Sequence, residues 1–327
     1  AVAALSPCPT RIDGGEALRR RPMGALHSAL EGLGAQVTPL GAPGCLPVEV
    51  ARGGLRGGRI ELAGDTSSQF ITALMLIAPL LEGGLIIEIT STLVSRPYVE
   101  MTAAVMSSFG IGGIALSESV IHVEAGAYRP TSYQVEPDAS SASYPLAAAA
   151  IAGGRVTVAG LGHNSLQGDA AFAGILATMG CAVLVDDHQT VVERGAALRG
   201  IQIDMADYSD LVPTVAAVAA FADSPTEITG VGFIRNKESD RLSDLAEGLR
   251  RVGCGAEVLD DGLRISPQSP ASYVGTELAV HHDHRLAMAW SLLALRIAGV
   301  SVDDPSVVSK SWPAWWTIRR AMLGLSR

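Results

Sequence analysis

The sequence predicts an α/β (α+β) protein in which one helix-and-strand unit is repeated along the chain. Three observations lead to this fold class. Hydrophobic residues make up 48% of the 327 residues and charged residues only 17%, so a sizeable core is expected. Apolar helical stretches alternate with short strand-like runs. The alternation returns at a nearly constant spacing, which indicates an internal repeat.

Eight segments carry the repeat, in two interleaved sets. In chain order, the first four are RPMGALHSALEGLGAQV (21–37), TSSQFITALMLIAPLLEGGLIIEI (66–89), RPYVEMTAAVMSSFGI (96–111) and ASSASYPLAAAAIAGGRVTVAG (139–160). The next four are GDAAFAGILATMGCAVLV (168–185), YSDLVPTVAAVAAFADSPTEITG (208–230), DRLSDLAEGLRRVGCGAEV (240–258) and DHRLAMAWSLLALRIAGVSV (283–302). Each begins with polar or charged residues, continues as an apolar helix, breaks at Gly or Pro and resumes as a short strand.

The spacing of these segments predicts four units of helix, strand, helix and strand, each with an extra strand. Starts recur every 72 to 75 residues in the odd-numbered set and every 69 to 75 residues in the even-numbered set. The even-numbered helices are apolar almost all round, which is typical of buried helices. Chance recurrence in an Ala- and Gly-rich sequence is the alternative interpretation.

Charge and cysteine content narrow the class of function. The formal net charge of −9 argues against a general nucleic-acid or anionic-membrane binder, so an anionic substrate would have to be met by a local cluster of arginines. The four cysteines are scattered without a C-x-x-C pair, which favours buried thiols in a reducing, cytoplasmic compartment and disfavours a zinc site. No run is long enough to cross a bilayer, and the opening AVAALSPCPT lacks the pattern of a signal peptide.

The polar starts of the expected helices are candidate anion sites. Exposed N–H groups and the positive end of the helix dipole attract phosphate and carboxylate groups. If the repeated units point their helices in the same direction, several of these starts would converge. Such a site would suit a substrate that carries those groups.

The stretch NKESDRL (236–242) places charged side chains at the start of a helix. Lys237 and Glu238 lie four and three residues before Arg241, so the three side chains would share one face of the first turn. Seen alone, the stretch also fits an ordinary charged helix start. Lys237 and Lys310 are the only lysines among 24 basic residues, and lysine is a compact charge whose three donors can be shared among ligands.

Two further helix starts carry polar side chains. HHDHRLAMAW (281–290) places His284 and Arg285 directly after a capping Asp283, although an isolated Asp-His-Arg would be only a cap. Whether His284 orients a substrate, polarises it or simply caps the helix stays open. SSQF (67–70) offers three hydrogen-bonding side chains, and its simpler interpretation is an N-cap serine.

Together these motifs resemble one family, the 5-enolpyruvylshikimate-3-phosphate synthases. TSSQF, SRPYVEMT, PDASSASYPLAAAAI, NSLQGD, KESDRL and DHRLAMA follow one another in the family's order, and the resemblance runs from about Arg21 to Lys310. It implies a two-domain enolpyruvyl transferase fold with three copies of the unit in each domain, of which four of the usual six are present here. Residues 1–135 would be a partial first domain on the shikimate 3-phosphate side, and 136–327 the second domain on the phosphoenolpyruvate side.

The resemblance also implies an enzyme, a 3-phosphoshikimate 1-carboxyvinyltransferase of the shikimate pathway of aromatic amino acid biosynthesis. This enzyme transfers the enolpyruvyl group of phosphoenolpyruvate to the 5-hydroxyl of shikimate 3-phosphate and releases phosphate, with no metal or organic cofactor. The chemistry needs a base for the hydroxyl, an acid for the methylene carbon, and cations for the phosphates and carboxylates.

Residue roles follow from the positions that match the family's motifs. The catalytic residues would be Asp210, which accepts the hydroxyl proton, Glu238, which delivers a proton to the methylene carbon and later removes one, and Lys237, which lies between the substrates. The residues expected at phosphoenolpyruvate are Arg21, Gln69, Arg241, Arg285 and Lys310. Those expected at shikimate 3-phosphate are Ser67, Ser68, Gln69, Ser95, Tyr98, Asp210 and Lys237.

Three departures from the family pattern leave alternatives open. Arg20 replaces the glutamate that usually precedes Arg21, and Phe233 stands where some members have an asparagine. The chain begins after the family's first two units, so the N-terminal Lys-Ser and the Asn-Ala-Gly-Thr turn are expected to be missing. One alternative is therefore an incomplete or non-catalytic fragment that binds substrate or needs a separate N-terminal piece. Another is a UDP-N-acetylglucosamine enolpyruvyl transferase, but Cys8 lies thirteen residues before Arg21, too far for that enzyme's pattern.

Overall fold

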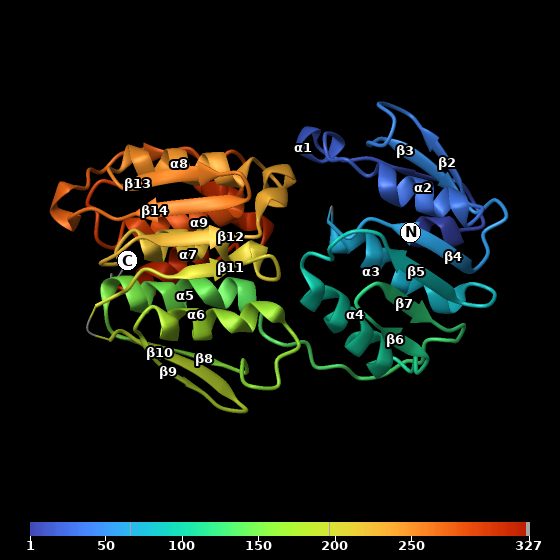
Figure 1. Cartoon of the computed structure of the whole chain (residues 1–327), viewed down its shortest axis with the longest axis horizontal. Coiled ribbons are helices and arrows are strands. Elements are labelled where there is room, and N and C mark those ends of the chain that lie inside the picture. Colours follow the sequence, from blue (N-terminus) through green and yellow to red (C-terminus); the bar gives the residue numbers. More distant parts are fainter. Residues whose placement is uncertain (66, 196, 325–327) are drawn as a thin grey trace. The chain divides into compact units, whose positions relative to one another are not determined.

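The chain divides into two compact units, a first unit of residues Ala1–Val135 and a second unit of residues Glu136–Arg327 (Figure 1). The structure is a computed structural model that describes residues 1–65, 67–195 and 197–324. Thr66, where the second repeat segment was expected to begin, lies outside the described residues. Among the described residues, no helix is both long and apolar enough to cross a membrane.

The first unit contains two sheets and the helices that cover them. Its helices are α1 (Glu16–Arg19), α2 (Gly24–Gly32), α3 (Ser68–Ile77) and α4 (Arg96–Ser108), with short 3-10 helices η1 (Val2–Leu5) and η2 (Ala78–Leu80). Its strands are β1 (Thr10–Ile12), β2 (Gln36–Pro39), β3 (Val48–Ala51), β4 (Gly58–Leu62), β5 (Leu85–Ile89), β6 (Ile114–Leu116) and β7 (Val120–Val123). The strand orders are β1-β3-β2 and β4-β5-β7-β6.

The second unit contains three sheets. Its helices are α5 (Ala139–Ala152), α6 (Phe172–Thr178), α7 (Val212–Ala219), α8 (Arg241–Arg251), α9 (His284–Leu293) and α10 (Trp315–Met322). Its strands are β8 (Arg155–Ala159), β9 (Ala182–Val185), β10 (Gln189–Glu193), β11 (Gln202–Asp204), β12 (Thr226–Thr229), β13 (Gly255–Leu259), β14 (Gly262–Ser266), β15 (Glu277–Leu278) and β16 (Ser301–Val302). Its 3-10 helices are η3 (Gly168–Ala171), η4 (Ser209–Leu211), η5 (Gly232–Asn236), η6 (Pro270–Ser272) and η7 (Pro305–Lys310). The strand orders are β8-β10-β9, β11-β12-β14-β13 and β15-β16.

The repeat expected from the sequence appears as a repeat of sheet topology. In β4-β5-β7-β6 and β11-β12-β14-β13 alike, the first two strands are parallel and the remaining neighbours are antiparallel. The three-stranded sheets reproduce the antiparallel part, and β15-β16 reproduces the parallel pair. Each parallel pair needs a crossover connection, which α3, α7 and α9 provide. The α/β fold class is therefore confirmed.

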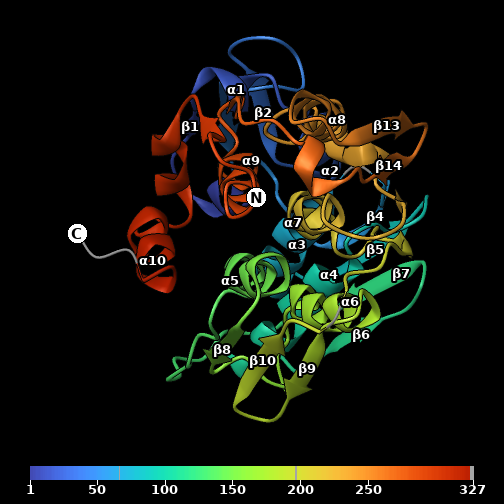
Figure 2. The ribbon, with the colours of Figure 1, turned by 90° about the vertical axis from the view of Figure 1, so that its left-hand side faces the viewer.

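The core of the second unit is a group of helices. The helices α5, α7 and α9 pack against one another, and Figure 2 shows them nearly end on. All eight residues of α7 and nine of the ten in α9 are buried, as expected for helices that are apolar all round. In the first unit α3 departs from this expectation, because it leaves Leu76 43% exposed.

Candidate functional site

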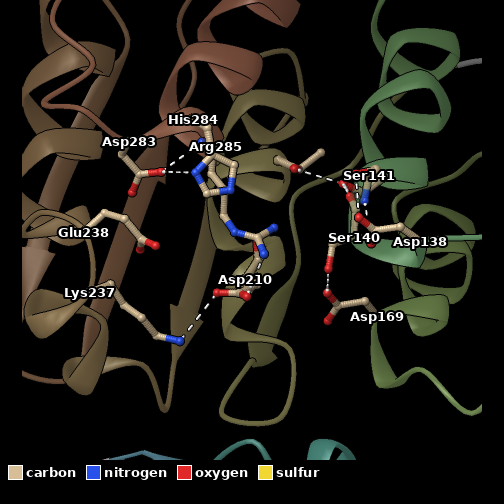
Figure 3. Close-up of polar contacts among 12 residues, drawn as sticks. Asp138, Ser140, Ser141, Asp169, Asp210, Lys237, Glu238, Asp283, His284 and Arg285 are labelled. Atoms are coloured by element: carbon tan, nitrogen blue, oxygen red, sulfur yellow. Dashed lines mark hydrogen bonds and ion pairs between the residues drawn. The ribbon is translucent and has the colours of Figure 1, made fainter. Parts of the chain in front are cut away.

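Charged residues at the starts of three helices of the second unit form one connected network, of which Figure 3 shows Asp210, Lys237, Glu238, Asp283 and Arg285. Asp210 belongs to η4, directly before α7. Its Oδ1 accepts a hydrogen bond from Arg241 Nη1 of α8 at 3.0 Å, and its Oδ2 accepts one from Arg285 Nη2 of α9 at 2.7 Å. The convergence of helix starts that the sequence predicted is thus confirmed for α7, α8 and α9.

Arg241 lies at the centre of this network. Its three side-chain nitrogens contact three different carboxylates: Nε donates to Asp283 at 2.7 Å, Nη1 to Asp210 at 3.0 Å and Nη2 to Glu238 at 2.7 Å. The Arg241 side chain is only 1% exposed. A rigid, planar fork with five donors holds several carboxylates in fixed directions, whereas the three donors of a lysine rotate about a single nitrogen.

Both lysines of the chain belong to the same network. Lys237 Nζ lies 3.5 Å from Asp210 Oδ1 and 5.8 Å from the centroid of the Phe233 ring. Lys310 Nζ, at the end of η7, lies 2.6 Å from Glu238 Oε1, and its side chain is 54% exposed. Each proposed catalytic carboxylate therefore contacts Arg241 and also a lysine.

The expected helical placement of Lys237 and Glu238 is wrong. The helix α8 begins at Arg241, after Asp240, whose side chain caps it by accepting the Ser243 N–H at 3.2 Å. Lys237 follows η5 with a non-helical backbone, φ −83° and ψ −141°. The two residues thus precede the first turn, because the capping aspartate stops the helix from extending backwards. Glu238 still reaches Arg241, but from the loop.

The network fixes the charge state of its buried members. Burial alone would raise the pKa of Asp210, but the cations of Arg285, Lys237 and Arg241 outweigh it and hold this pKa far below its ordinary value. Burial would lower the pKa of Arg241, but Asp283, Asp210 and Glu238 raise it. Three carboxylates meet four cations, namely Asp210, Glu238 and Asp283 with Lys237, Arg241, Arg285 and Lys310. The surplus positive charge favours the binding of anions.

Asp283 has a second role that the sequence did not indicate. Its Oδ1 caps α9 by accepting the Arg285 N–H at 2.8 Å, as expected, but its Oδ2 also holds Arg241. The side chain is 0% exposed. In the sequence, an acid directly before His-Arg indicates only the cap, because the same pattern fits an exposed capping residue that has no contact with Arg241.

His284 is the first residue of α9 and is buried. Burial, followed by the charge of Arg285, lowers its pKa to about 4, so the imidazole is neutral at pH 7. Its Nδ1 lies 3.7 Å from Asp283 Oδ1 and has no hydrogen-bond partner among the described residues. The cap of α9 is therefore Asp283 and not His284.

The expected serines of the first unit lie at two helix starts. Ser67 caps α3 by accepting the Gln69 N–H at 3.3 Å; Ser68 is buried and Gln69 is exposed. Ser95 is the N-cap of α4, with φ +55°, and its carbonyl accepts the Tyr98 N–H at 3.1 Å. Since few non-glycine residues adopt positive φ, the strained backbone at buried Ser95 fits a functional position.

Arg21 lies outside these helices, in the segment between α1 and α2. Its N–H donates to the Leu18 carbonyl at 3.2 Å. Arg20, which replaces the expected glutamate, pairs with Glu16 at 2.8 Å on an exposed surface.

The second unit also contains an apolar hollow. It has a volume of about 730 Å³ and opens between β8, the start of α5 and Trp312, but it is lined mostly by apolar groups and includes none of the expected residues. The charges needed for an anionic substrate are in the network instead. In the described part of the chain, no group of three or more His, Cys, Asp or Glu residues is arranged to hold a metal ion.

Known proteins resemble this chain over nearly all its length. The 3-phosphoshikimate 1-carboxyvinyltransferase of Methanoculleus marisnigri is 43% identical over 316 residues, which are 96% of this chain and 74% of that protein. The enzyme of the same name from Nostoc punctiforme is 41% identical over 318 residues, 97% of this chain and 74% of the relative. That of Yersinia ruckeri is 42% identical over 307 residues, 93% of this chain and 71% of the relative.

The fold leads to the same family. The solved structure of EPSP synthase from Acinetobacter baumannii superposes with a TM-score of 0.78 at 26% sequence identity, covering 98% of this chain and 75% of that one. The sequence profile of EPSP synthase (3-phosphoshikimate 1-carboxyvinyltransferase) matches residues 1–318. The chain belongs to the EPSP synthase family.

Proposed function

We propose that this chain transfers the enolpyruvyl group of phosphoenolpyruvate to the 5-hydroxyl of shikimate 3-phosphate and releases phosphate. One observation carries the proposal. Asp210 and Glu238, the two carboxylates assigned to proton transfer, share the buried Arg241, and each also contacts a lysine, at 3.5 Å and 2.6 Å. The reaction needs carboxylates and phosphate-binding cations side by side, and this network supplies both.

Asp210 accepts the proton of the substrate hydroxyl. Without substrate, its neighbouring cations make it a weak base, because they lower its pKa far below the ordinary value after offsetting the effect of burial. Anionic substrates that bind Arg285 and Lys237 neutralise these cations and loosen their contacts with Asp210. Binding therefore raises the basicity of Asp210 at the moment a base is needed.

Glu238 first takes up a proton from solvent, then gives it to the methylene carbon, and takes one back from the resulting methyl group when phosphate leaves. Its two oxygens are held by different cations, Oε2 by Arg241 and Oε1 by Lys310. Arg241 is buried and fixed, whereas Lys310 is 54% exposed. The exposed lysine moves toward the incoming phosphoenolpyruvate and frees one oxygen of Glu238.

The second unit supplies most of the residues that we assign to phosphoenolpyruvate, and the first unit supplies most of those that we assign to shikimate 3-phosphate. Arginine suits the carboxylate and phosphate of phosphoenolpyruvate, because a guanidinium fork binds both groups in a bidentate way. The residues we assign to phosphoenolpyruvate are Arg21, Gln69, Arg241, Arg285 and Lys310. Those we assign to shikimate 3-phosphate are Ser67, Ser68, Gln69, Ser95, Tyr98, Asp210 and Lys237. The hydroxyls and N–H groups at the starts of α3 and α4 support the second set.

A second candidate function is a chain that needs a separate N-terminal segment for turnover. The observation that favours it is the length of the relatives, because this chain spans about three quarters of them, 74% of the Methanoculleus marisnigri protein. In this version the chain binds the substrates, and the supplied segment completes the catalytic site. The compartment we propose is the cytoplasm, which the four free cysteines fit.

Phosphorus NMR tests both versions directly. The chain is mixed with shikimate 3-phosphate and phosphoenolpyruvate, with and without the N-terminal segment of the Methanoculleus marisnigri relative. Phosphate and enolpyruvyl product from the chain alone support the first version, and product only with the segment supports the second. No product in either mixture, with phosphoenolpyruvate unchanged, overturns the proposed function. The Asp210→Asn variant is the control for a contaminating activity.

A further inference from the structure

A second buried aspartate, Asp169, lies in the second unit outside the network described above. It belongs to η3 and is 4% exposed. Ser140, in the first turn of α5, donates its hydroxyl proton to Asp169 Oδ2, and Figure 3 shows the two side chains pointing at each other. No reaction step assigned so far uses this carboxyl group.

Hydrogen bonds connect Asp169 with the helix that follows Asp210. The Ser140 carbonyl accepts a hydrogen bond from Ser143 Oγ at 2.6 Å. Ser143 Oγ lies 3.1 Å from Thr214 Oγ1 of α7, and because Ser143 already donates its proton to Ser140, the Thr214 hydroxyl is the donor in this pair. The side chains of Ser143 and Thr214 are buried. The chain of contacts therefore ends one helical turn after Asp210.

A second set of hydrogen bonds joins the start of α5 to the segment that contains Asp169. Gln167, directly before η3, accepts the Ala139 N–H at 2.8 Å with its Oε1 and donates to the Pro137 carbonyl with its Nε2 at 2.7 Å. Asp138 caps the helix by accepting the Ser141 N–H at 3.2 Å. The segment around Asp169 and the first turn of α5 thus form one hydrogen-bonded block.

Asp169 is also coupled electrostatically to the network. Burial raises its pKa to about 6, the Ser140 hydrogen bond opposes this, the charges of Asp210 and Asp138 raise it further and Arg285 lowers it. Such coupling is reciprocal, so an ionised Asp169 also raises the pKa of Asp210. This effect opposes the three cations that make Asp210 a weak base.

We propose that Asp169 is a positioning residue for Asp210, acting through the Ser140–Ser143–Thr214 contacts and through its own negative charge. The inference rests on the proposed function, in which Asp210 is the base. Protonation of Asp169 removes the charge and weakens the hold on Ser140. Turnover therefore falls as the pH drops through about 6, where Asp169 takes up its proton.

The variant Asp169→Asn, which removes the Asp169 charge, tests the proposal. Its turnover is measured under whichever condition, with or without the N-terminal segment, gives turnover of the native chain. In Asp169→Asn we expect kcat at pH 7.5 to fall about tenfold or more and KM for phosphoenolpyruvate to change by less than about threefold, with the decline near pH 6 absent. Asp187→Asn, at an exposed position of the same unit, should retain both the rate and the decline. An Asp169→Asn variant with the native rate and pH profile would overturn the inference.

Ser140→Ala provides a second variant that leaves the Asp169 charge in place. Because the Ser140 hydrogen bond lowers the pKa of Asp169, its loss should move the acid decline of kcat to higher pH. A purely structural role for Asp169 predicts no movement of this decline. The variant therefore decides the question even where Asp169→Asn does not fold.

A measurement without turnover separates this inference from the proposed function. The carboxyl carbon of Asp169 is titrated by NMR in the native chain and in Asp210→Asn. Since the Asp210 charge raises the pKa of Asp169, we expect its removal to lower the midpoint by about half a pH unit or more. An unchanged midpoint would overturn the coupling, whether or not the chain proves to be a synthase.

Discussion

Arg241 and Asp283 form a salt bridge that is almost completely buried. Arg241 Nε donates to Asp283 Oδ2 at 2.7 Å, and the two side chains are 1% and 0% exposed. This contact fixes one edge of the guanidinium group and directs its other two nitrogens toward Asp210 and Glu238. Asp283 therefore holds Arg241 in position. Both of its carboxylate oxygens already accept hydrogen bonds from protein groups, Oδ2 from Arg241 and Oδ1 from the Arg285 N–H.

Removal of the Asp283 charge should destabilise the second unit. Asp283→Asn keeps a cap for α9 but leaves the buried Arg241 with one carboxylate fewer, and breaking a buried ion pair costs about 3–5 kcal/mol. Urea unfolding followed by tryptophan fluorescence measures this loss, because Trp290, Trp312, Trp315 and Trp316 all lie in the second unit. Glu247→Gln, at an exposed position of α8, should stay within about 0.5 kcal/mol of the native chain. Equal unfolding midpoints for Asp283→Asn and the native chain would contradict the role of Asp283 in holding Arg241.

Lys237→Arg should abolish most of the activity although it preserves the charge. The Lys237 ammonium group lies 3.5 Å from Asp210 and 5.8 Å from the Phe233 ring centroid, and a planar guanidinium does not fit the same contacts. We expect kcat/KM, measured by phosphate release, to fall about 100-fold. Arg235→Lys is the matched control, because Arg235 forms a half-exposed pair with Asp240 at 3.4 Å and has no role in the proposal. An active Lys237→Arg enzyme would show that only the charge matters.

Asp210→Asn should separate binding from chemistry. The loss of the base should lower kcat about 10²- to 10⁴-fold. The same change frees Arg241 and Arg285 from a competing carboxylate, so phosphoenolpyruvate should bind about three- to tenfold more tightly. Isothermal titration calorimetry gives the affinity, and phosphorus NMR gives the rate. Weaker binding together with an intact rate would exclude Asp210 as the base.

The repeat and the network residues could be predicted from the sequence because they depend on short-range patterns. Periodic apolar segments predicted the α/β class, and the charged helix starts singled out Arg241 and Arg285. Asp210 came from the resemblance to the family, and the structure joins it to both arginines by direct contacts. The buried helices α7 and α9 followed from the absence of a polar face.

What the sequence could not predict depends on contacts between distant segments. Asp283 looks like an ordinary helix cap, and its second contact is made with Arg241, 42 residues away. Asp169 stands in a motif with no assigned role, and its partner Ser140 lies 29 residues away. The start of α8 was placed wrongly because three charged residues at helical spacing look the same in a loop as in a first turn. The capping geometry of Asp240 decides between the two.

His284 should make the stability of the second unit depend on pH. Burial and Arg285 lower its folded pKa to about 4, whereas its ordinary value is 6.5. Between these values the unfolded chain takes up a proton that the folded chain does not, so the His284 contribution to the free energy of unfolding decreases as the pH falls from about 6.5 to about 4. Asp169 acts in the opposite direction between its ordinary value of 3.8 and about 6, because there the folded state holds the extra proton.

The difference between the native chain and His284→Gln isolates the histidine from this opposing effect. We expect the unfolding free energy of the native chain to drop relative to that of His284→Gln as the pH is lowered from 6.5 to 4, and to run parallel to it above pH 7. Urea unfolding with tryptophan fluorescence at several pH values measures both. His163→Asn, at an exposed position, should follow the native curve. Parallel curves for His284→Gln and the native chain through the whole window would mean that the buried imidazole accepts a proton without cost, which would contradict the lowered pKa of His284.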